Sequence, residues 1–242
     1  DLSTRWNARV ATRVIADSEA TRRDLIRFYH TPADKIAVIY PGVGPEFAPV
    51  TDAAARRAAR QRYGLPEEYI LYVGTLQPRK NLARLVQAFS ILCQKPGAPD
   101  LVIAGKKGWL YDEIYRQVSV LGLEGRVHFP GYVAQEDLPA LLSGARCFAL
   151  PSLYEGFGLP VLEAMACGTP VVCSNVSSLP EVAGDAGLLV DPTDTAALAE
   201  ALRVAALHNP TRQRLIAAGL AQAARFSWDR CAREIWGILA NR

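Results

Sequence analysis

The middle of the chain, residues 69–190, alternates between short apolar runs and stretches in which apolar residues have helical spacing. Strands that are apolar throughout and separated by helices are typical of a parallel sheet with both faces covered. Right-handed crossovers between such strands predict an α/β fold, a Rossmann-like doubly wound parallel sheet of about six strands. The predicted strands are residues 69–74, 101–105, 126–129, 147–150, 170–173 and 187–190, and the helices between them are residues 82–93, 110–121, 135–143 and 160–167.

Further elements flank this alternation. The predicted helices lie at residues 1–13, 20–29 and 53–63 before it and near 195–207, 211–224 and 228–240 after it, with short strands at 13–16 and 35–40. Asp17 and Ser18 mark the start of the helix at 20–29, because their side chains accept hydrogen bonds from the exposed N–H groups of a first helical turn. Two strands seldom fold alone, so we expect residues 1–44 to be the end of a domain that begins upstream.

Charge and hydropathy exclude several classes of protein. A net charge of +3 over 242 residues is too mild to indicate a nucleic-acid partner. The apolar runs are shorter than the ~20 residues that a membrane span needs, and no signal-peptide pattern opens the sequence, so we expect a cytoplasmic protein. The five cysteines have irregular spacing and mostly apolar neighbours, which is typical of buried free thiols and not of a metal site.

The residues that are suited to binding or catalysis lie in four loops that follow predicted strands. In open α/β sheets, ligands bind at the carboxyl ends of the strands, where these loops begin. The first loop, residues 74–81, begins with Gly74 and places Arg79 and Lys80 just before a helix. Cations disfavour a helix N-terminus by a few tenths of a kcal/mol, so a compensating anion is expected. A phosphate ~4 Å from one such charge gains about 4 kcal/mol at an effective dielectric near 20, before desolvation. The alternative is a surface charge pair that flanks a helix start.

The second and third loops leave two interpretations open each. The second loop contains Lys106 next to Lys107 and is bounded by glycines, which fits either a phosphate contact or a solvated turn. In the third loop, the backbone near Val133 can read a base and Tyr132 can stack on it. A tyrosine at the end of a strand is also a common packing residue.

The fourth loop follows the strand at 147–150 and contains Gly156, Gly158 and two carboxylates, Glu155 and Glu163. Glycines at a strand-to-helix turn let a ligand approach the backbone, and the free N–H groups of the helix start favour an anion such as phosphate. Carboxylates so placed accept hydrogen bonds from hydroxyls, as the acidic ribose ligand of dinucleotide sites does. A glycosidase acid/base pair would also use two glutamates, but it leaves the glycines and the Arg79–Lys80 pair unexplained. The structural alternative is a helix-capping Glu155 and a surface Glu163.

Two common nucleotide-binding motifs are absent from the sequence. No G-x-G-x-x-G opens the first strand–helix turn of the alternating region, and no G-x-x-x-x-G-K-[ST] occurs. A dinucleotide dehydrogenase and a P-loop NTPase are therefore disfavoured. The three histidines are scattered and pair with no serine or cysteine in a nucleophile motif, so none receives a role.

The four loops resemble the donor-binding half of retaining glycosyltransferases of family 4, which have the two-domain GT-B fold. The specific match is the E-x7-E element from Glu155 to Glu163, and the resemblance extends over nearly the whole chain. The supporting segments are residues 74–82, 131–133, 166–172, 179–182 and 226–228.

The resemblance implies a role for each matching position. In such a family the residue at the position of Lys80 binds the donor diphosphate with Arg79 nearby, Glu163 binds the ribose hydroxyls, and Glu155 reaches the transferred sugar. Backbone N–H groups of residues 157–159 hold sugar and phosphate, and the backbone near Val133 holds the base. The resemblance thus predicts the catalytic residues Glu155, Lys80 and Arg79. It predicts the binding residues Gly74, Thr75, Arg79, Lys80, Lys106, Tyr132, Val133, Glu155, Gly156, Phe157, Gly158, Leu159 and Glu163.

One departure from the family pattern bears on the donor. Many members carry an arginine directly after the glycine of the first loop, where this chain has Thr75, so the second diphosphate cation must come from Arg79 or elsewhere. The version with Thr75 and Arg79 looks like bacterial mannosyl- and rhamnosyltransferases of surface-polysaccharide assembly, which makes GDP-mannose the first expectation. The resemblance implies transfer with retention to a glycan or lipid-linked acceptor, without metal or cofactor, and peripheral association with the inner face of the membrane.

The resemblance also implies a division of the chain. Residues 1–44 correspond to the end of the acceptor-binding N-terminal domain, 45–66 to a linker and helix, 67–226 to the nucleotide-sugar donor-binding domain, and 227–242 to a C-terminal helix that crosses back. We therefore expect the chain to bind nucleotide and to transfer sugar poorly or not at all by itself. Two alternatives stay open: a non-catalytic nucleotide-sugar-binding module, and a GT-B-type epimerase or phosphorylase.

Overall fold

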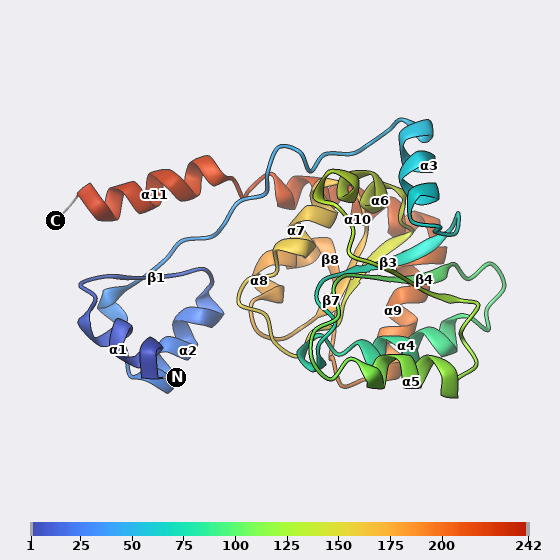
Figure 1. Cartoon of the computed structure of the whole chain (residues 1–242). Coiled ribbons are helices and arrows are strands. Elements are labelled where there is room, and N and C mark those ends of the chain that lie inside the picture. The colour runs from blue at the N-terminus through green and yellow to red at the C-terminus, as the bar shows by residue number, and fades with distance from the viewer. Residues whose placement is uncertain (1, 241–242) are drawn as a thin grey trace.

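A six-stranded parallel sheet organises the protein (Figure 1). The computed structural model describes residues 2–240, and its sheet has the strand order β5-β4-β3-β6-β7-β8. The strands are β3 (Tyr69–Val73), β4 (Asp100–Ala104), β5 (Val127–Gly131), β6 (Cys147–Leu150), β7 (Val171–Ser174) and β8 (Gly187–Val190). The direction of strand addition reverses between β3 and β6, and such a switch point opens a crevice beyond the carboxyl ends of the strands. The predicted doubly wound α/β fold is confirmed.

Helices cover both faces of this sheet, which is why the central strands are apolar throughout. The helices of this domain are α3 (Ala53–Arg62), α4 (Leu82–Leu92), α5 (Asp112–Val120), α6 (Leu138–Gly144), α7 (Leu159–Ala166), α8 (Leu179–Ala183), α9 (Thr195–Leu207) and α10 (Asn209–Ala223). The last helix, α11 (Trp228–Ala240), extends away from the sheet (Figure 1). Helix α4 packs against α5 and α9, while α6 packs against α3 and α7. Residues 69–72 of β3 and all of β6 are fully buried between these layers.

Strand β5 is longer than predicted and ends at Gly131. It includes Pro130, which is tolerated because β5 lies at the edge of the sheet, where one side of the strand needs no donor. The register between β4 and β5 shifts between Val102 and Ala104, and the Gly105 N–H donates to the Gly131 carbonyl at 2.7 Å. The third loop is thereby held directly beside the second.

A smaller unit precedes the sheet and consists of α1 (Leu2–Val10), β1 (Val14–Ala16), α2 (Glu19–Tyr29) and β2 (Ile36–Val38). Its two strands pair in parallel. Ser18 caps α2 as predicted, since its Oγ accepts the Thr21 N–H at 2.9 Å. This N-terminal unit and α11 lie on the same side of the six-stranded sheet in Figure 1. Tyr154, in the loop after β6, donates its hydroxyl to Asp24 Oδ2 of α2 at 2.7 Å.

The chain passes from the N-terminal unit to the sheet domain near Gly42 and returns near Ser227. These two segments are in contact. Val43 pairs with Ser227 in an isolated parallel bridge. A Cβ atom on Gly42 would lie 2.1 Å from the Trp228 nitrogen, so only glycine permits this approach. Three rings pack beside the crossing: Tyr40 lies 6.0 Å from Phe157 and 5.7 Å from Phe226, and the last two are 5.9 Å apart.

Replacing Gly42 with alanine is expected to destabilise the protein, because backbone and not a flexible side chain occupies the position of the new methyl group. The free energy of unfolding should fall by about 2 kcal/mol, which corresponds to a melting temperature about 5 °C lower. Thermal unfolding followed by circular dichroism measures this. Gly125→Ala is the matched control, because a Cβ there meets nothing within 4 Å. Equal melting temperatures for the two variants would contradict the close crossing.

The cysteines are free thiols, and Cys147, Cys167, Cys173 and Cys231 are buried. Burial raises the pKa of Cys147 and of Cys173 to about 12, so these thiols stay protonated and unreactive near neutral pH. No helix within residues 2–240 combines the length and the apolar character needed to cross a membrane.

Candidate functional site

A cavity of about 420 Å³ lies beyond the carboxyl ends of β3 and β4, beside the switch point of the sheet. It is bounded by the ends of β3 and β4, the loop after β5, the linker before α3, and α7. Six of the predicted binding residues line it: Gly74, Thr75, Lys106, Tyr132, Val133 and Glu163. Phe47, Gln135 and Leu138 also line it, and nothing in the sequence pattern singled them out.

Glycine forms the floor of the cavity where β3 and β4 end side by side. Gly105 has φ +147°, and a Cβ atom there would lie 1.9 Å from the Gly74 carbonyl oxygen. A side chain at Gly105 therefore cannot be accommodated without moving the neighbouring strand end. The two glycines keep the floor flat and open to a ligand.

Tyr132 and Lys106 form one rim of the cavity. Tyr132 is 61% exposed, so it is not a core packing residue. The Lys106 ammonium lies 4.8 Å from the centre of the Tyr132 ring, a cation–π distance. The neighbouring Lys107 instead lies over Tyr111, at 5.0 Å. Only one of the two lysines of the second loop therefore reaches the cavity.

The third loop is held in place by Tyr63, which follows α3. Its hydroxyl accepts the Ala134 N–H at 3.1 Å and donates to Asp137 at 2.7 Å. Arg62 donates to the same carboxylate at 2.6 Å. These contacts fix the backbone that follows Val133, whose side chain is buried.

Glu163 projects from α7 and lines the cavity, so it is not the surface residue of the structural alternative. Burial, together with the negative charge of Glu46 as the smaller cause, raises the pKa of Glu163 to about 7. The carboxyl group therefore changes charge near neutral pH. As a carboxylate it is suited to accept hydrogen bonds from the hydroxyls of a ligand.

A second cluster, made of Lys80, Arg79, Glu155 and Ser152, joins the first and fourth loops. Lys80 Nζ lies 2.5 Å from Glu155 Oε1, and Arg79 Nη1 lies 2.8 Å from Glu155 Oε2. Ser152 Oγ donates to Glu155 Oε1 at 2.6 Å. Lys80 is only 8% exposed and Glu155 only 7%, so neither belongs to a surface charge pair. Glu155 does not cap α7 either, since Gly158 occupies that position.

Opposing effects set the ionisation of Glu155. Burial alone would raise its pKa, but hydrogen bonds from Lys80, Ser152 and Arg79 outweigh burial and hold the pKa below its ordinary value. Glu155 is thus a carboxylate at neutral pH. It neutralises one of the two adjacent cations, which leaves one positive charge for an anionic ligand.

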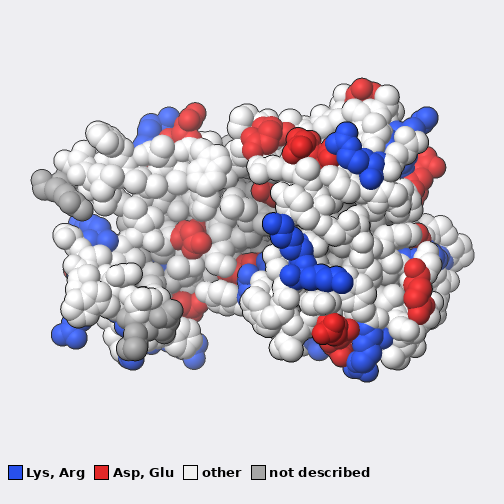
Figure 2. Space-filling model, in the orientation of Figure 1, with Lys and Arg blue, Asp and Glu red and all other residues white. Residues whose placement is uncertain are grey.

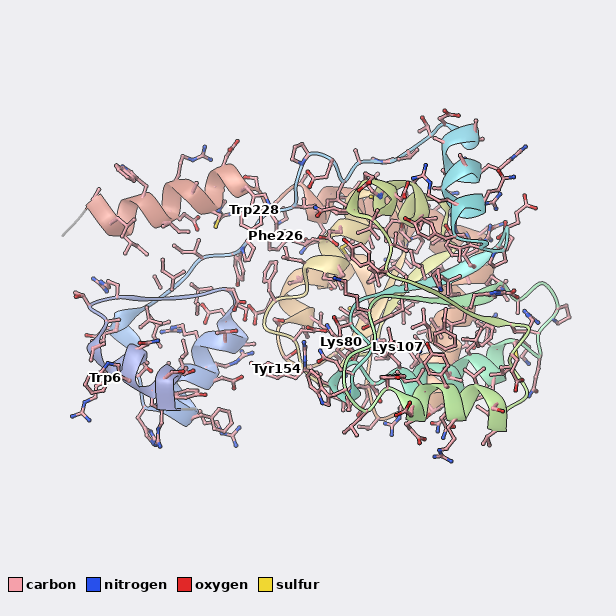
Figure 3. The ribbon with its side chains drawn as sticks, in the orientation of Figure 1. Trp6, Lys80, Lys107, Tyr154, Phe226 and Trp228 are labelled. Atoms are coloured by element: carbon pink, nitrogen blue, oxygen red, sulfur yellow. The ribbon has the colours of Figure 1, made fainter. Side chains whose placement is uncertain are left out.

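The cavity and the cluster are neighbours. The Tyr72 hydroxyl donates to the Thr75 carbonyl at 3.3 Å. Burial of Tyr72 raises its pKa, and the charge of Glu155 adds to this increase. Tyr72 therefore lies beneath both the first loop and the cluster. Figure 3 shows Lys80 on the side of the sheet that faces the N-terminal unit, near Tyr154. Figure 2 shows a hollow between the two units with Lys and Arg side chains beside it.

The fourth loop presents unpaired backbone donors. Helix α7 begins at Leu159, and Gly158 before it has φ +108° with no side-chain cap. Within the described residues 2–240, the N–H groups of Phe157, Gly158 and Leu159 donate to no acceptor. Free N–H groups at the positive end of a helix dipole form an anion site.

No metal site accompanies these groups in the described part of the chain, where no cluster of three or more His, Cys, Asp or Glu has a metal-binding arrangement. His128 bonds to Asp100 Oδ2 at 2.7 Å, in the strands at the edge of the sheet.

The fold is that of the GT-B class of glycosyltransferases. The chain belongs to the family described as Glycosyl transferases group 1, which matches residues 55–222. The family described as Glycosyltransferase Family 4 matches residues 2–47. The expected family is confirmed.

Sequence relatives agree with this family. O-antigen chain mannosyltransferase B of Escherichia coli is 41% identical over 223 residues, which are 91% of this chain and 58% of that protein. The serotype-specific mannosyltransferase WbdA of Escherichia coli is 34% identical over 92% of this chain and 28% of its own length. A D-inositol 3-phosphate glycosyltransferase of Salinispora tropica is 35% identical over 94% of this chain and 50% of its own length. The chain thus spans between 28% and 58% of the length of these relatives.

Solved structures share the fold over essentially all of the chain. Anabaena Alr3699/HepE, solved with UDP and glucose, has a TM-score of 0.89 and 26% identity, covering 100% of this chain and 66% of that one. Sucrose-phosphate synthase of Thermosynechococcus elongatus has a TM-score of 0.85 and 31% identity, covering 99% of this chain and 60% of that one.

Proposed function

We propose that the chain is the donor-binding part of a retaining glycosyltransferase that transfers a hexosyl group from a nucleotide-sugar to a glycan or lipid-linked acceptor. The observation that carries the proposal is that two half-sites lie next to each other beyond the carboxyl ends of the central strands. One is a cavity of about 420 Å³ with a half-buried carboxyl group, Glu163, and the other is the buried Lys80–Glu155–Arg79 cluster. A nucleoside with a charged diphosphate needs both kinds of surroundings.

The proposed donor position follows from the chemistry of each group. The base lies against the backbone near Val133 and the ring of Tyr132, and Glu163 accepts from the ribose hydroxyls. The diphosphate lies between the Lys80–Arg79 cations and the free N–H groups of residues 157–159. Glu155 then faces the transferred sugar.

The proposed mechanism uses the same cations. Negative charge develops on the nucleoside diphosphate as it leaves, and Lys80, Arg79 and the α7 N-terminus stabilise that charge more in the transition state than in the bound donor. These groups supply the positive charge, so the proposal includes no metal ion and no cofactor. The acceptor hydroxyl attacks the face from which the diphosphate departs, which retains the configuration of the sugar.

The donor is proposed to be GDP-mannose. Two similar proteins are named mannosyltransferases, and this chain carries Thr75 with Arg79 in the first loop. HepE, in contrast, was solved with UDP-glucose. Isothermal titration calorimetry with GDP, UDP, ADP and dTDP separates these donors. GDP is expected to bind most tightly. Tighter binding of another nucleotide would reassign the base, and no binding of any would contradict a donor-binding function.

The proposed division of the chain keeps residues 1–44 as the end of the acceptor-binding domain, 45–66 as the linker and α3, 67–226 as the donor-binding domain, and 227–242 as the returning helix. The match of residues 2–47 to a second family description supports a domain boundary near residue 44. A chain with only part of the acceptor domain is expected to bind donor but to transfer sugar poorly. Its place of action is proposed to be the cytoplasm, at the inner face of the membrane where lipid-linked acceptors lie.

A further inference from the structure

The backbone carbonyls of residues 155–158, the donor loop, all accept hydrogen bonds. Ser178 Oγ lies 3.0 Å from the Glu155 carbonyl oxygen and 2.7 Å from that of Phe157, so its proton is shared. The Gly158 carbonyl accepts the Val161 N–H at 2.9 Å. The Gly156 carbonyl accepts from Ser18 Oγ at 2.7 Å and from Thr21 Oγ1 at 3.3 Å.

This pattern orients the opposite side of the donor loop. When the carbonyls of consecutive peptides are bound on one side, their N–H groups face elsewhere because each peptide unit is planar. The N–H groups of Phe157 and Gly158 belong to the peptides whose carbonyls are those of Gly156 and Phe157. These are the N–H groups that lack acceptors within residues 2–240. The hydroxyls that bind the Gly156 and Phe157 carbonyls therefore set the direction of the Phe157 and Gly158 N–H groups, which are donors of the anion site.

Two of those hydroxyls come from the other unit. Ser18 and Thr21 lie at the start of α2, more than 130 positions before Gly156 in the sequence. Ser18 is fully buried in this contact. Asp17 also approaches, since a Cβ atom on Gly156 would lie 3.2 Å from Asp17 Oδ2. The conformation of Gly156 thus depends on the N-terminal unit as well as on its own domain.

A carboxylate from the sheet domain holds the start of α2 in return. Glu181, on α8, accepts the N–H groups of Glu19 and Ala20, each at 2.8 Å. The Tyr40 hydroxyl donates to the same carboxylate at 3.2 Å. A carboxylate at a helix N-terminus satisfies the first N–H groups and interacts favourably with the helix dipole. Ser18 accepts the next N–H, that of Thr21. The N–H groups of residues 19–21, at the N-terminus of α2, therefore all have acceptors.

We propose that Ser18, Thr21 and Glu181 are positioning residues for the donor loop. Glu181 fixes the start of α2, and the Ser18 and Thr21 hydroxyls then hold the Gly156 carbonyl away from the ligand. The Phe157 and Gly158 N–H groups are thereby kept pointed at a diphosphate. The ligand assignment rests on the proposed function, whereas the effect on the loop itself does not.

Four variants separate this role from simple capping of α2. Ser18→Ala removes both the cap and the bond to Gly156, while Ser18→Thr keeps a hydroxyl for both. Thr21→Val removes the hydroxyl that contacts both the Gly156 carbonyl and Ser18 Oγ, and leaves the capped N–H in place. Glu181→Gln keeps the size of the side chain but loses the charge at the α2 terminus.

The first measurement is GDP affinity by calorimetry on the whole chain. Ser18→Ala is expected to weaken GDP binding about tenfold, the effect of one hydrogen bond of ordinary strength, and Thr21→Val and Glu181→Gln by smaller factors. Ser18→Thr should restore the affinity of the unchanged chain. A Ser18→Ala variant with a lower melting temperature but unchanged GDP affinity would overturn the proposal, because capping alone predicts that result.

The second measurement is amide hydrogen exchange of the ligand-free chain, which needs no nucleotide. Ser18→Ala should speed the exchange of the Glu155 amide, which donates to Ser177 Oγ, and of the Val161 amide, which donates to the Gly158 carbonyl. Ser18→Thr should return both amides to the original rate. Unchanged exchange of both amides in Ser18→Ala would also overturn the proposal. If the unchanged chain binds no nucleotide, the proposed function fails, and the exchange rates alone decide whether Ser18 positions the loop.

Discussion

Replacing Lys80 with alanine is expected to weaken GDP binding about a hundredfold, the loss of a charge-assisted contact of nearly 3 kcal/mol. In an enzyme that contains this chain, kcat/KM for sugar transfer should fall by at least the same factor, because the contact strengthens as charge develops on the leaving diphosphate. The effect is large because Lys80 is buried, where a charge is screened less than at the surface. Calorimetry and initial-rate measurements test the two parts.

Lys95→Ala is the matched control for this variant. It removes the same charge from the chain, but Lys95 is exposed and lies outside the site. The Lys80→Ala variant also leaves Glu155 with Arg79 and Ser152 as its remaining partners, so its melting temperature must be measured to show that it folds. Nearly unchanged GDP affinity in a folded Lys80→Ala protein would remove Lys80 from the phosphate site.

The affinity for GDP is expected to rise about tenfold between pH 6 and pH 8 through Glu163. A carboxyl group with a pKa of about 7 is about one-tenth ionised at pH 6 and nine-tenths ionised at pH 8. If ribose hydroxyls bond to the carboxylate, affinity follows the ionised fraction. Because GDP itself also titrates in this range, the comparison is with Glu163→Gln, which should keep only the dependence that belongs to the ligand. Identical pH profiles for both proteins would contradict the ribose assignment.

The same group makes stability depend on pH in the opposite direction. The pKa of Glu163 is raised on folding from its ordinary value of 4.5 to about 7. The folded protein therefore binds the proton more tightly than the unfolded chain, and stability falls as pH rises from about 4.5 to about 7. At pH 8, Glu163→Gln should be more stable than the unchanged chain by up to about 3 kcal/mol. At pH 4 this advantage should disappear in urea unfolding.

Glu46→Gln provides an independent check on the cause of the shift. It removes the neighbouring negative charge and leaves the burial of Glu163 unchanged, so the midpoint of the GDP affinity profile should move to lower pH. Burial is the larger cause of the raised pKa, so only part of the shift should be lost. A midpoint that stays where it was would assign the whole shift to burial.

Local signals were sufficient for most elements of the fold. The runs in β3, β4 and β6 are apolar because both faces of these strands are covered, and that pattern alone predicts a parallel sheet. Ser18 was correctly expected at the start of α2, since capping depends only on neighbouring residues. The end of β5 was missed, because Pro130 normally terminates a strand and is tolerated only at a sheet edge. The short helix α8 was also missed, although its Glu181 turned out to make contacts across the molecule.

The candidate site was predictable as a set of loops but not as a set of contacts. Lys80 and Glu155 are 75 positions apart, and they meet because β3 and β6 are neighbours in the sheet. No local pattern contains that strand order. The sequence likewise cannot place Glu46 beside Glu163, or the Ser18 hydroxyl on the Gly156 carbonyl. Their energetic effects arise from burial and long-range proximity, which exist only after the chain has folded.

The contact at Gly42 limits how the two units can move with respect to each other. Backbone touches backbone there, so the N-terminal unit can turn about this point but can scarcely slide along it. Under such a rotation, displacement grows with distance from the axis. Tyr40, two positions from Gly42, would stay near Phe157, whereas Asp24 would travel far from Tyr154, which Figure 3 places away from Phe226 and Trp228. The Tyr154–Asp24 hydrogen bond is therefore expected to break first. The ring contacts of Tyr40, which lie close to the axis of rotation, are expected to break last.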